Sequence, residues 1–395
     1  MRVLDHSLRG GRHTSRKNGW TNINLFAGAG GLALGVERAG FGDLQLFEID
    51  AQACQTLQWN IVSRNPTLTG LVRPGDVRRV DWSGFDWRTR LLTAGVPCQP
   101  FSVAGTGRGD SDTRNLFPEA LRAVRELAPE AALFENVSGL VFSDDLRRYF
   151  DYVLRQLHHP SLAPEKDETW LEHDRRIARH ERLRGARSEY NVIWKLLNAA
   201  DFGIPQVRWR VFIVATKGHL PQYTFPEATH SRGALLSALA SGAYWRGHHL
   251  RPRQMHPNGS ALPASEGRLR WRTVRDALVG LPPMARNASA DGMNHWRIPG
   301  ARGYQRHTGS RLDWPSKTIK AGVHGVPGGE NAVVQANGRI RYFSFREAAR
   351  LQTFPDNHVF LGSRNHITSQ VGNAVPVDLA QVVARPLFRI LGNGD

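Results

Sequence analysis

Short apolar runs alternate with helix-like patterns through the first half of the chain. Strands are predicted over residues 21–25 (TNINL), 45–49 (QLFEI), 91–96 (LLTAGV), 131–134 (AALF) and 211–215 (VFIVA), and helices over 31–39 and 51–60. Strands that alternate with helices favour an α/β fold, with a mostly parallel sheet covered by helices on both faces. Polar residues that follow such strands gather at one edge of the sheet, where ligands bind.

The composition and charge of the rest of the chain suggest where domains begin and end. Residues 1–19 form a basic N-terminal arm, and residues 20–217 form a first domain with a charged helical insertion at about 160–187. Residues 218–367 are expected to form a smaller, irregular, strand-rich domain, because Gly, Pro, His, Arg and Trp are frequent there and periodicity is weak. A final helix in residues 368–395 is expected to return to the first domain.

Charge indicates the class of partner. The 395 residues include 52 Lys and Arg against 35 Asp and Glu, for a formal charge of +17. Such a balance favours nucleic acid as partner, although it could also be a solubility surface. The two cysteines are too few for a disulfide framework or a cysteine zinc site. With no membrane-spanning run and no secretory signal, a cytoplasmic, nucleoid-associated protein is expected.

Three motifs indicate a nucleotide-like cofactor. The segment 26–31 (FAGAGG) joins the first strand to the first helix, and its glycines allow a ligand to approach the backbone closely. Glu48 ends the second strand, where an acid commonly binds the hydroxyls of a ribose. Asp76, in the sequence GDV, could accept a hydrogen bond from an adenine amino group. Either acid could instead cap a helix, but their order favours an adenosine cofactor.

Cys98 begins the loop after the predicted strand 91–96, in the sequence GVPCQPFS. A deprotonated thiol is an effective nucleophile, and the stretch 103–115 is expected to be a loop able to close over a substrate. Cys54 lies inside a helical pattern and is expected to be a core residue. Glu135 ends the strand 131–134, which places a carboxylate near Cys98 at the sheet edge, where it could give or share a proton.

Two arginines precede the last predicted strand, in the sequence QVRWR. Alternate residues share one face of a strand, so Arg208 and Arg210 are expected to point the same way. Two guanidinium groups aimed together suit a carbonyl oxygen or a phosphate, although such a pair is often only a solvated face.

The order of these motifs resembles that of the DNA (cytosine-5)-methyltransferases of bacterial restriction-modification systems. The matching segments are FAGAGG, FEID, GDV, GVPCQPFS, TRNLF, FENV, QVRWR, REAARLQTFPD and QVGNAVP, between about residues 22 and 391. One position departs, because Ile49 stands where many members carry a bulkier aromatic against adenine. The resemblance implies a Rossmann-like, S-adenosylmethionine-dependent methyltransferase fold, with residues 218–367 as target-recognition domain.

The resemblance also implies a role for each matching residue. Cys98 would add to C6 of a cytosine flipped out of the duplex, and Glu135 would hold N3 and the exocyclic amine of that base. Arg208 and Arg210 would order the nucleophile loop and contact the base carbonyl. The S-adenosylmethionine pocket would be lined by Phe26, Gly28, Gly30, Gly31, Glu48, Ile49, Asp76, Pro97, Leu116 and Asn373. Gln99, Ser102 and Arg108 would contact DNA, and no metal is expected.

The partners implied are double-stranded DNA and a restriction endonuclease that acts on the same site without forming a stable complex with a monomeric enzyme. Three alternatives stay open. An RNA cytosine-5 methyltransferase would share the fold. A silent DNA-binding relative would not need Cys98, Glu135 and Arg210. A nicotinamide-dependent enzyme would explain the glycine turn but not the later motifs. Base contacts are expected near residues 320–331 (KAGVHGVPGGEN).

Overall fold

A computed structural model describes residues 20–42, 44–64, 71–85, 88–97, 115–184, 187–252, 267–286, 293–301, 308–322 and 331–392. The chain divides into two compact units. The first comprises Met1–Leu196, Arg210–Phe225 and Val383–Asp395, and the second comprises Leu197–Trp209 and Pro226–Val382. Composition alone placed residues 197–209 in the first domain, whereas their contacts place them in the second unit, where Gln206 forms a parallel bridge with Ser316.

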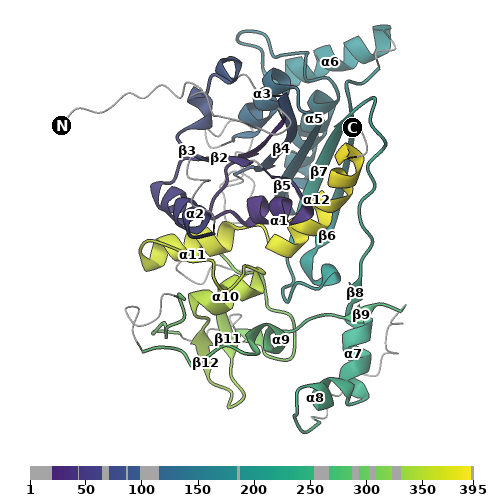
Figure 1. Cartoon of the computed structure of the whole chain (residues 1–395). Coiled ribbons are helices and arrows are strands. Elements are labelled where there is room, and N and C mark those ends of the chain that lie inside the picture. The colour runs from purple at the N-terminus through teal and green to yellow at the C-terminus, as the bar shows by residue number, and fades with distance from the viewer. Residues whose placement is uncertain are drawn as a thin grey trace, which may run out of the picture. The chain divides into compact units, whose positions relative to one another are not determined.

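The first unit is built around a sheet of seven strands (Figure 1). The strand order is β3-β2-β1-β4-β5-β7-β6. β1 pairs in parallel with β2 and β4, β2 with β3, and β4 with β5, whereas β7 is antiparallel to β5. The predicted α/β fold with a mostly parallel sheet is therefore confirmed. The strands are β1 (Trp20–Leu25), β2 (Leu44–Glu48), β3 (Val72–Pro74), β4 (Arg88–Gly95), β5 (Ala131–Val137), β6 (Tyr190–Asn198) and β7 (Trp209–Lys217).

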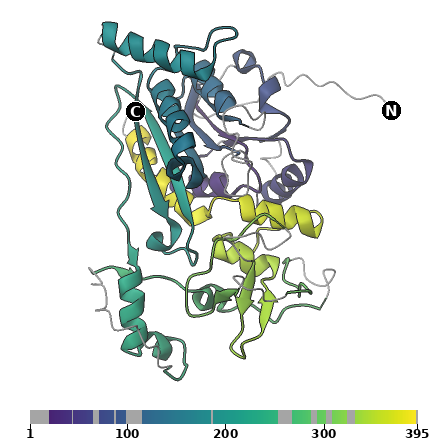
Figure 2. The ribbon, with the colours of Figure 1, turned by 180° about the vertical axis from the view of Figure 1, so that it is seen from behind.

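Helices cover both faces of this sheet, as the views from the two sides show (Figures 1 and 2). One face carries α1 and α2, and the other carries α3 and α5. The helices of this region are α1 (Gly31–Ala39), α2 (Ala51–Arg64), α3 (Phe117–Leu127), α4 (Gly139–Phe142), α5 (Asp144–His158), α6 (Trp170–Arg184) and α12 (Val377–Gly392), with 3-10 turns η2 (Val77–Arg79) and η3 (Trp82–Gly84).

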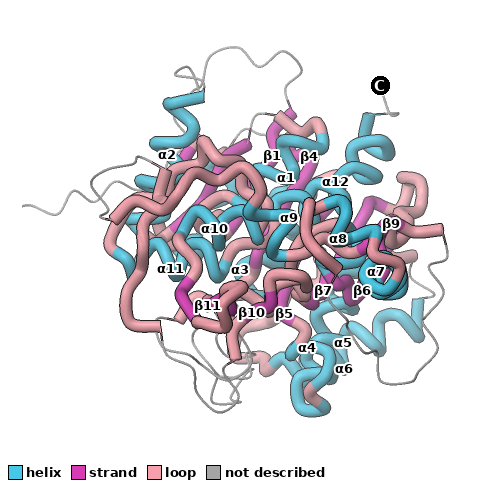
Figure 3. Tube along the Cα trace, turned by 90° about the horizontal axis from the view of Figure 1, so that it is seen from below, coloured by secondary structure: helices cyan, strands magenta, loops and turns pink. Residues whose placement is uncertain are grey.

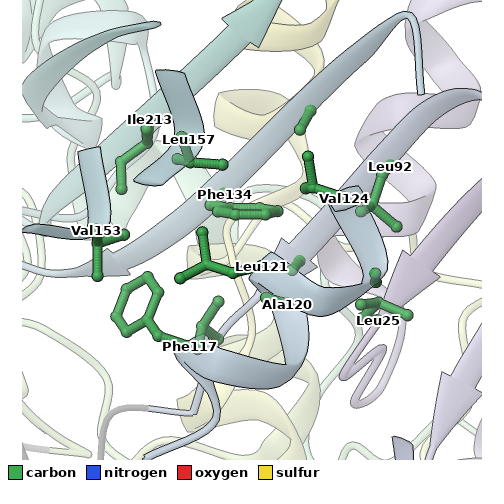
Figure 4. Close-up of a cluster of buried hydrophobic side chains, with 14 of the residues drawn as sticks. Leu25, Leu92, Phe117, Ala120, Leu121, Val124, Phe134, Val153, Leu157 and Ile213 are labelled. Carbon is green, nitrogen blue, oxygen red and sulfur yellow. The ribbon is translucent and has the colours of Figure 1, made fainter. Parts of the chain in front are cut away.

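The core between β5 and its covering helices fixes the orientation of β5. The Phe134 ring of β5 lies among the side chains of α3 and α5, with Leu121 and Leu157 close by (Figure 4). These three side chains are almost fully buried, and truncating a buried Phe typically costs about 3–5 kcal/mol. Because successive side chains of a strand point to opposite faces, the packing of Phe134 directs Glu135 to the other face of the sheet.

The charged segment 160–187 contains the helix α6. One side of this helix is buried against α5: the Tyr152 hydroxyl lies 2.9 Å from Nδ1 of His173, and the Ile177 side chain is fully buried. The opposite side exposes Arg175, Arg179 and Arg182, at the spacing of one helix face. The segment is thus a packed amphipathic helix with a basic outer face.

The second unit has short strands joined by long connections, and Figure 3 shows β10 and β11 as brief magenta segments between pink loops. β10, β11 and β12 form one sheet, and β8 pairs with β9. The elements are β8 (His230–Ser231), α7 (Arg232–Ala240), α8 (Ala243–Gly247), β9 (Leu269–Arg270), α9 (Val274–Leu278), β10 (Ser310–Arg311), β11 (Ala332–Val334), β12 (Ile340–Tyr342), α10 (Phe345–Leu351) and α11 (Arg364–Asn373), with the 3-10 turn η5 (Ala199–Phe202). None of the helices described in either unit could cross a bilayer.

Candidate active site at the carboxyl edge of the sheet

The glycine-rich turn after β1 has the backbone shape that the sequence requires. Phe26, Gly28 and Gly30 all have positive φ, at 55°, 54° and 90°. The Gly30 N–H donates to the Ala27 carbonyl at 2.9 Å and so closes the turn before α1, in which Gly31 is buried. A Cβ atom added at Gly30 would lie 2.8 Å from Cδ2 of Leu57, which would have to shift, and the φ of 90° is itself strained for any other residue, so glycine is favoured there.

Gly28 is needed for a different reason. Among the described residues, a Cβ atom added at Gly28 would meet no heavy atom within 4 Å. Internal packing therefore does not demand a glycine at this place. The open space beside its backbone is what a ligand that approaches the main chain would use.

Glu48 is fixed next to this turn by three backbone hydrogen bonds. Its Oε2 accepts the Gly28 N–H at 2.7 Å, and its Oε1 accepts the N–H groups of Ile49 and Asp50 at 2.9 and 2.8 Å. A carboxylate held in this way keeps lone pairs for further donors such as ribose hydroxyls. The neighbouring Ile49 side chain is 64% exposed, which leaves an apolar surface beside the acid.

Asp76 caps the turn η2 with its side chain, which accepts the backbone N–H of Arg78 at 3.0 Å. The Arg78 guanidinium also binds both carboxylate oxygens, at 2.7 Å for the shortest contact. These hydrogen bonds from Arg78 lower the pKa of Asp76. The capping role weighed from the sequence is therefore present, and the contact of Asp76 with adenine stays a prediction.

Glu135 and Arg210 meet across the antiparallel pair β5 and β7. Glu135 pairs with Phe212 and Val137 with Arg210, so Glu135 and Arg210 are diagonal neighbours on one face. The Nε atom of Arg210 lies 2.9 Å from Oε1 of Glu135, and the two side chains are only 12% and 9% exposed. The pair is thus a largely desolvated, charge-assisted contact at the carboxyl end of β5.

The small residue Gly95 links this pair to the glycine turn. Gly95 is the register partner of Glu135 on β4. A Cβ atom added at Gly95 would lie 4.0 Å from Oε2 of Glu135 and 4.0 Å from the carbonyl oxygen of Phe26. The acid and the turn therefore flank the same backbone position.

Asn136 was missed from the sequence, although it is even more buried than the acid before it. Its Nδ2 donates to the carbonyl of Val96 at 3.4 Å, and its Oδ1 accepts the Val137 N–H at 2.8 Å. Asn136 thereby ties the end of β5 to the strand end that leads to Cys98. The tripeptide ENV held the signal, because a buried amide at a strand end must find partners.

The nucleophile loop lies largely outside the described residues. Cys98, Gln99, Ser102 and Arg108 all fall there, so their predicted roles stay predictions. The described residues that border it are half-buried Pro97 on one side and half-buried Asn115 on the other, followed by half-buried Leu116, the cap residue of α3.

The second cysteine is a core residue, as predicted. Cys54 is buried in α2, and its Sγ lies 3.4 Å from the carbonyl oxygen of Glu48. Burial, with added repulsion from the carboxylates of Glu48 and Asp50, raises the pKa of its thiol to about 12. Such a thiol is almost never ionised near neutral pH, which makes Cys54 unsuited to nucleophilic chemistry.

Arg208 and Asn373 belong to the second unit. Asn373 ends α11, and its Nδ2 donates to the Ser369 hydroxyl at 3.2 Å. Arg208 is 1% exposed, and its terminal nitrogens donate to backbone carbonyls of that unit, including that of Gly372 at 2.8 Å. The two arginines of QVRWR therefore have different surroundings: Arg210 holds an acid of the first unit, and Arg208 is buried in the second.

The residues of the first unit fit an adenosine cofactor. Gly28 offers open backbone, Glu48 offers an oriented carboxylate, and Ile49 offers an exposed apolar side chain. No group of three His, Cys, Asp or Glu that could hold a metal ion is found in the part of the chain that the structure describes.

Comparison with known proteins identifies the family. Residues 20–160 and 181–389 match the C-5 cytosine-specific DNA methylase family, so the chain belongs to it. The protein is thus a DNA (cytosine-5-)-methyltransferase that uses S-adenosylmethionine, as predicted. The unmatched residues 161–180 coincide with the charged insertion that carries α6.

Similar proteins agree with this identification. The type II methyltransferase M.NgoMIV of Neisseria gonorrhoeae is 30% identical over 385 residues, which cover 94% of this chain and 98% of the relative. The type II methyltransferase M.Eco47II of Escherichia coli is 30% identical over 391 residues, covering 95% and 80%. The structure of the Dnmt2 methyltransferase of S. pombe is similar in fold, with a TM-score of 0.53 at 17% identity over 94% of this chain and 98% of that one.

Proposed function

We propose that this enzyme methylates C5 of a flipped-out cytosine in one specific sequence of duplex DNA, through a covalent bond between Cys98 and C6 of the base. We further propose that it is the modification enzyme of a restriction-modification system, acting as a monomer beside an endonuclease of the same specificity. The pair Glu135–Arg210 carries this proposal, because it sets a fixed, desolvated carboxylate beside Gly95, three residues before Cys98.

The proposed chemistry begins with Cys98, because C5 of cytosine is a poor nucleophile. The thiolate of Cys98 adds to C6, and the electron pair of the C5–C6 double bond makes C5 nucleophilic. Glu135 shares a proton with N3 during this step, and the Arg210 guanidinium holds the carboxylate in place. After methylation, a base removes the C5 proton, the double bond reforms and the Cys98 thiolate leaves.

Most of the predicted cofactor-binding residues belong to the first unit. Gly28, Glu48 and Ile49 would contact its adenosine portion, with Phe26, Gly30, Gly31, Asp76, Pro97, Leu116 and Asn373 as the remaining predicted lining. When bound, S-adenosylmethionine supplies an electrophilic methyl group. The backbone of Gly28 and the carboxylate of Glu48 would orient the cofactor without direct chemistry.

The second unit is proposed to read the DNA sequence, while Gln99, Ser102 and Arg108 contact the DNA near the target base. Bases are read through the grooves, and the formal charge of +17 favours phosphate contacts. M.NgoMIV and M.Eco47II, named as type II methyltransferases, support the restriction-modification role. Exchange of residues 218–340 for the segment of a relative should change the site methylated. Unchanged specificity would place recognition elsewhere.

Bisulfite sequencing of DNA from cells that express the protein tests the proposal. We expect protected cytosines at one position of one recurring sequence, and none in cells that express Cys98→Ala. The same preparation assayed on duplex DNA and on transfer RNA separates DNA from RNA as substrate. Methylation of RNA alone, or protected cytosines with Cys98→Ala, would overturn the proposal.

A further inference from the structure

The residues after β10 lie along the segment 205–208 within the second unit. The Val207 N–H donates to the Ser316 carbonyl at 2.9 Å, and the Ser316 N–H donates to the Pro205 carbonyl at 2.9 Å. Further along, the side chain Oε1 of Gln206 accepts the Ile319 N–H at 3.0 Å. Hydrogen bonds from the motif QVR and the residue before it thus fix the position of residues 316–319.

Arg208 holds the last of these residues, Ile319, in place. Its Nη1 donates to the Ile319 carbonyl at 2.9 Å, and its Nη2 donates to the carbonyls of Gly372 and Ala374 at 2.8 and 3.0 Å. The last two carbonyls lie at the C-terminal end of α11, where helices leave acceptors unsatisfied and favour a cation. A single buried guanidinium therefore joins residue 319 to the end of α11.

Gly372 and Asn331 make the same junction tight. A Cβ atom added at Gly372 would lie 2.2 Å from the backbone N of Ala321, so only glycine allows this approach. Asn331 accepts the Lys320 N–H at 2.9 Å and donates to the Lys320 carbonyl at 2.8 Å. The base contacts expected near 320–331 fall largely on residues 323–330, outside the described residues, and the described Lys320 and Asn331 on either side are bonded to each other.

We infer that Arg208, with Gln206, is a positioning residue for residues 316–322 of the proposed DNA-reading unit and does not touch the reacting cytosine. This inference rests on the proposed function. Both terminal nitrogens of the guanidinium donate to acceptors of the second unit, and the residue is 1% exposed. Arg208 acts through residue 319 by fixing the place of the described residues 320–322 that follow it, and so governs recognition of DNA more than turnover.

The chain offers a matched control in Arg346. This arginine is also fully buried in the second unit, and it also donates to backbone carbonyls, those of Met293 and Pro355 at 2.9 and 3.0 Å. These acceptors lie outside residues 316–331. Arg346→Lys therefore reports the cost of disturbing a buried arginine away from the proposed anchor.

The test compares Arg208→Lys, Asn331→Ala and Arg346→Lys in the full-length enzyme. For each variant, the thermal midpoint, the Kd and KM for a duplex containing the site, and kcat at saturating duplex are measured. The ratio of kcat/KM between that duplex and one with a single changed base pair is also measured. We expect Arg208→Lys and Asn331→Ala to raise KM and Kd roughly tenfold and to lower discrimination, with kcat nearly unchanged. Arg346→Lys should lower the thermal midpoint alone.

Two results would overturn the inference. A fall in kcat for Arg208→Lys with unchanged KM would mean that Arg208 acts on the reacting base. Equal effects of all three substitutions on KM and discrimination would mean that the anchor has only a structural role. If Arg208→Lys does not fold, Asn331→Ala tests the inference, because it removes the side-chain hydrogen bonds to Lys320 at a different residue. A wild-type enzyme that binds the duplex without methylating it would contradict the proposed function, and the Kd values would still test the anchor.

Discussion

The guanidinium of Arg210 lies 2.9 Å from the carboxylate of Glu135, which strand alternation places on the face of the sheet opposite to Phe134. The contact arises because β7 is antiparallel to β5, which brings the start of β7 next to the end of β5. The arginine holds the acid in a largely desolvated position, where the proposed function places the cytosine. Arg210 therefore supplies both charge compensation and orientation to Glu135.

Replacement of Glu135 by Gln should reduce kcat by about a hundredfold or more, because an amide cannot share a proton with N3 of the base. Binding of S-adenosylhomocysteine should stay near the wild-type value. Steady-state kinetics and calorimetry measure the two quantities. Glu130→Gln is the control, because Glu130 forms a similar pair with Lys217 at the opposite ends of the same strands, at 2.9 Å. Equal loss of kcat in both variants would count against a catalytic role for Glu135.

Arg210→Ala should destabilise the enzyme and also lower kcat. Removal of one partner leaves a largely buried carboxylate uncompensated, which costs about 3–5 kcal/mol for well-buried pairs. Arg210→Lys should recover part of the stability while kcat stays low, since a lysine does not reproduce the geometry of Nε. Denaturant unfolding and initial rates give both quantities. A wild-type kcat in Arg210→Ala would show that the ion pair with Glu135 is not needed for catalysis.

Gly28 and Gly30 should respond differently to alanine. Gly28→Ala should weaken S-adenosylhomocysteine binding with a modest loss of stability, about 1–2 kcal/mol for a left-handed alanine, because its Cβ would enter the open space beside the turn. Gly30→Ala should unfold at a clearly lower temperature, because alanine is strained at a φ of 90° and its Cβ would also displace the Leu57 side chain. Calorimetry and thermal melts measure both. Unweakened cofactor binding in Gly28→Ala would exclude that backbone from the cofactor site.

Cys54 should resist alkylation by iodoacetamide in the folded protein. At pH 8, a thiol with a pKa of about 12 is about one part in ten thousand thiolate, and Cys54 is buried as well. Its thiolate fraction rises only as the pH approaches 12, so native Cys54 should stay unmodified from pH 6 to 9. Mass spectrometry of peptides from native and urea-unfolded protein locates the label. Labelling of native Cys54 at the rate of the unfolded chain would contradict its place in the core.

Local patterns predicted the strands that lead into the site, because β1, β2, β4, β5 and β7 are short apolar runs that end in polar residues. They did not predict β6 (Tyr190–Asn198), whose side chains are mostly half-buried and lack a clean alternation. The surroundings of Arg208 could not be predicted from local patterns either. Its partners at 319, 372 and 374 are more than a hundred residues away in sequence, so only the folded chain reveals the junction.

Covalent trapping tests the central claim most directly. A duplex that carries 5-fluorocytosine at the target position should form a stable adduct with the enzyme in the presence of S-adenosylmethionine, because the fluorine at C5 cannot leave as a proton does. Denaturing electrophoresis detects the adduct, and peptide mass spectrometry should place it on Cys98, with none formed by Cys98→Ala. Absence of an adduct on a duplex whose unmodified form is methylated, or an adduct on Cys54, would contradict this account.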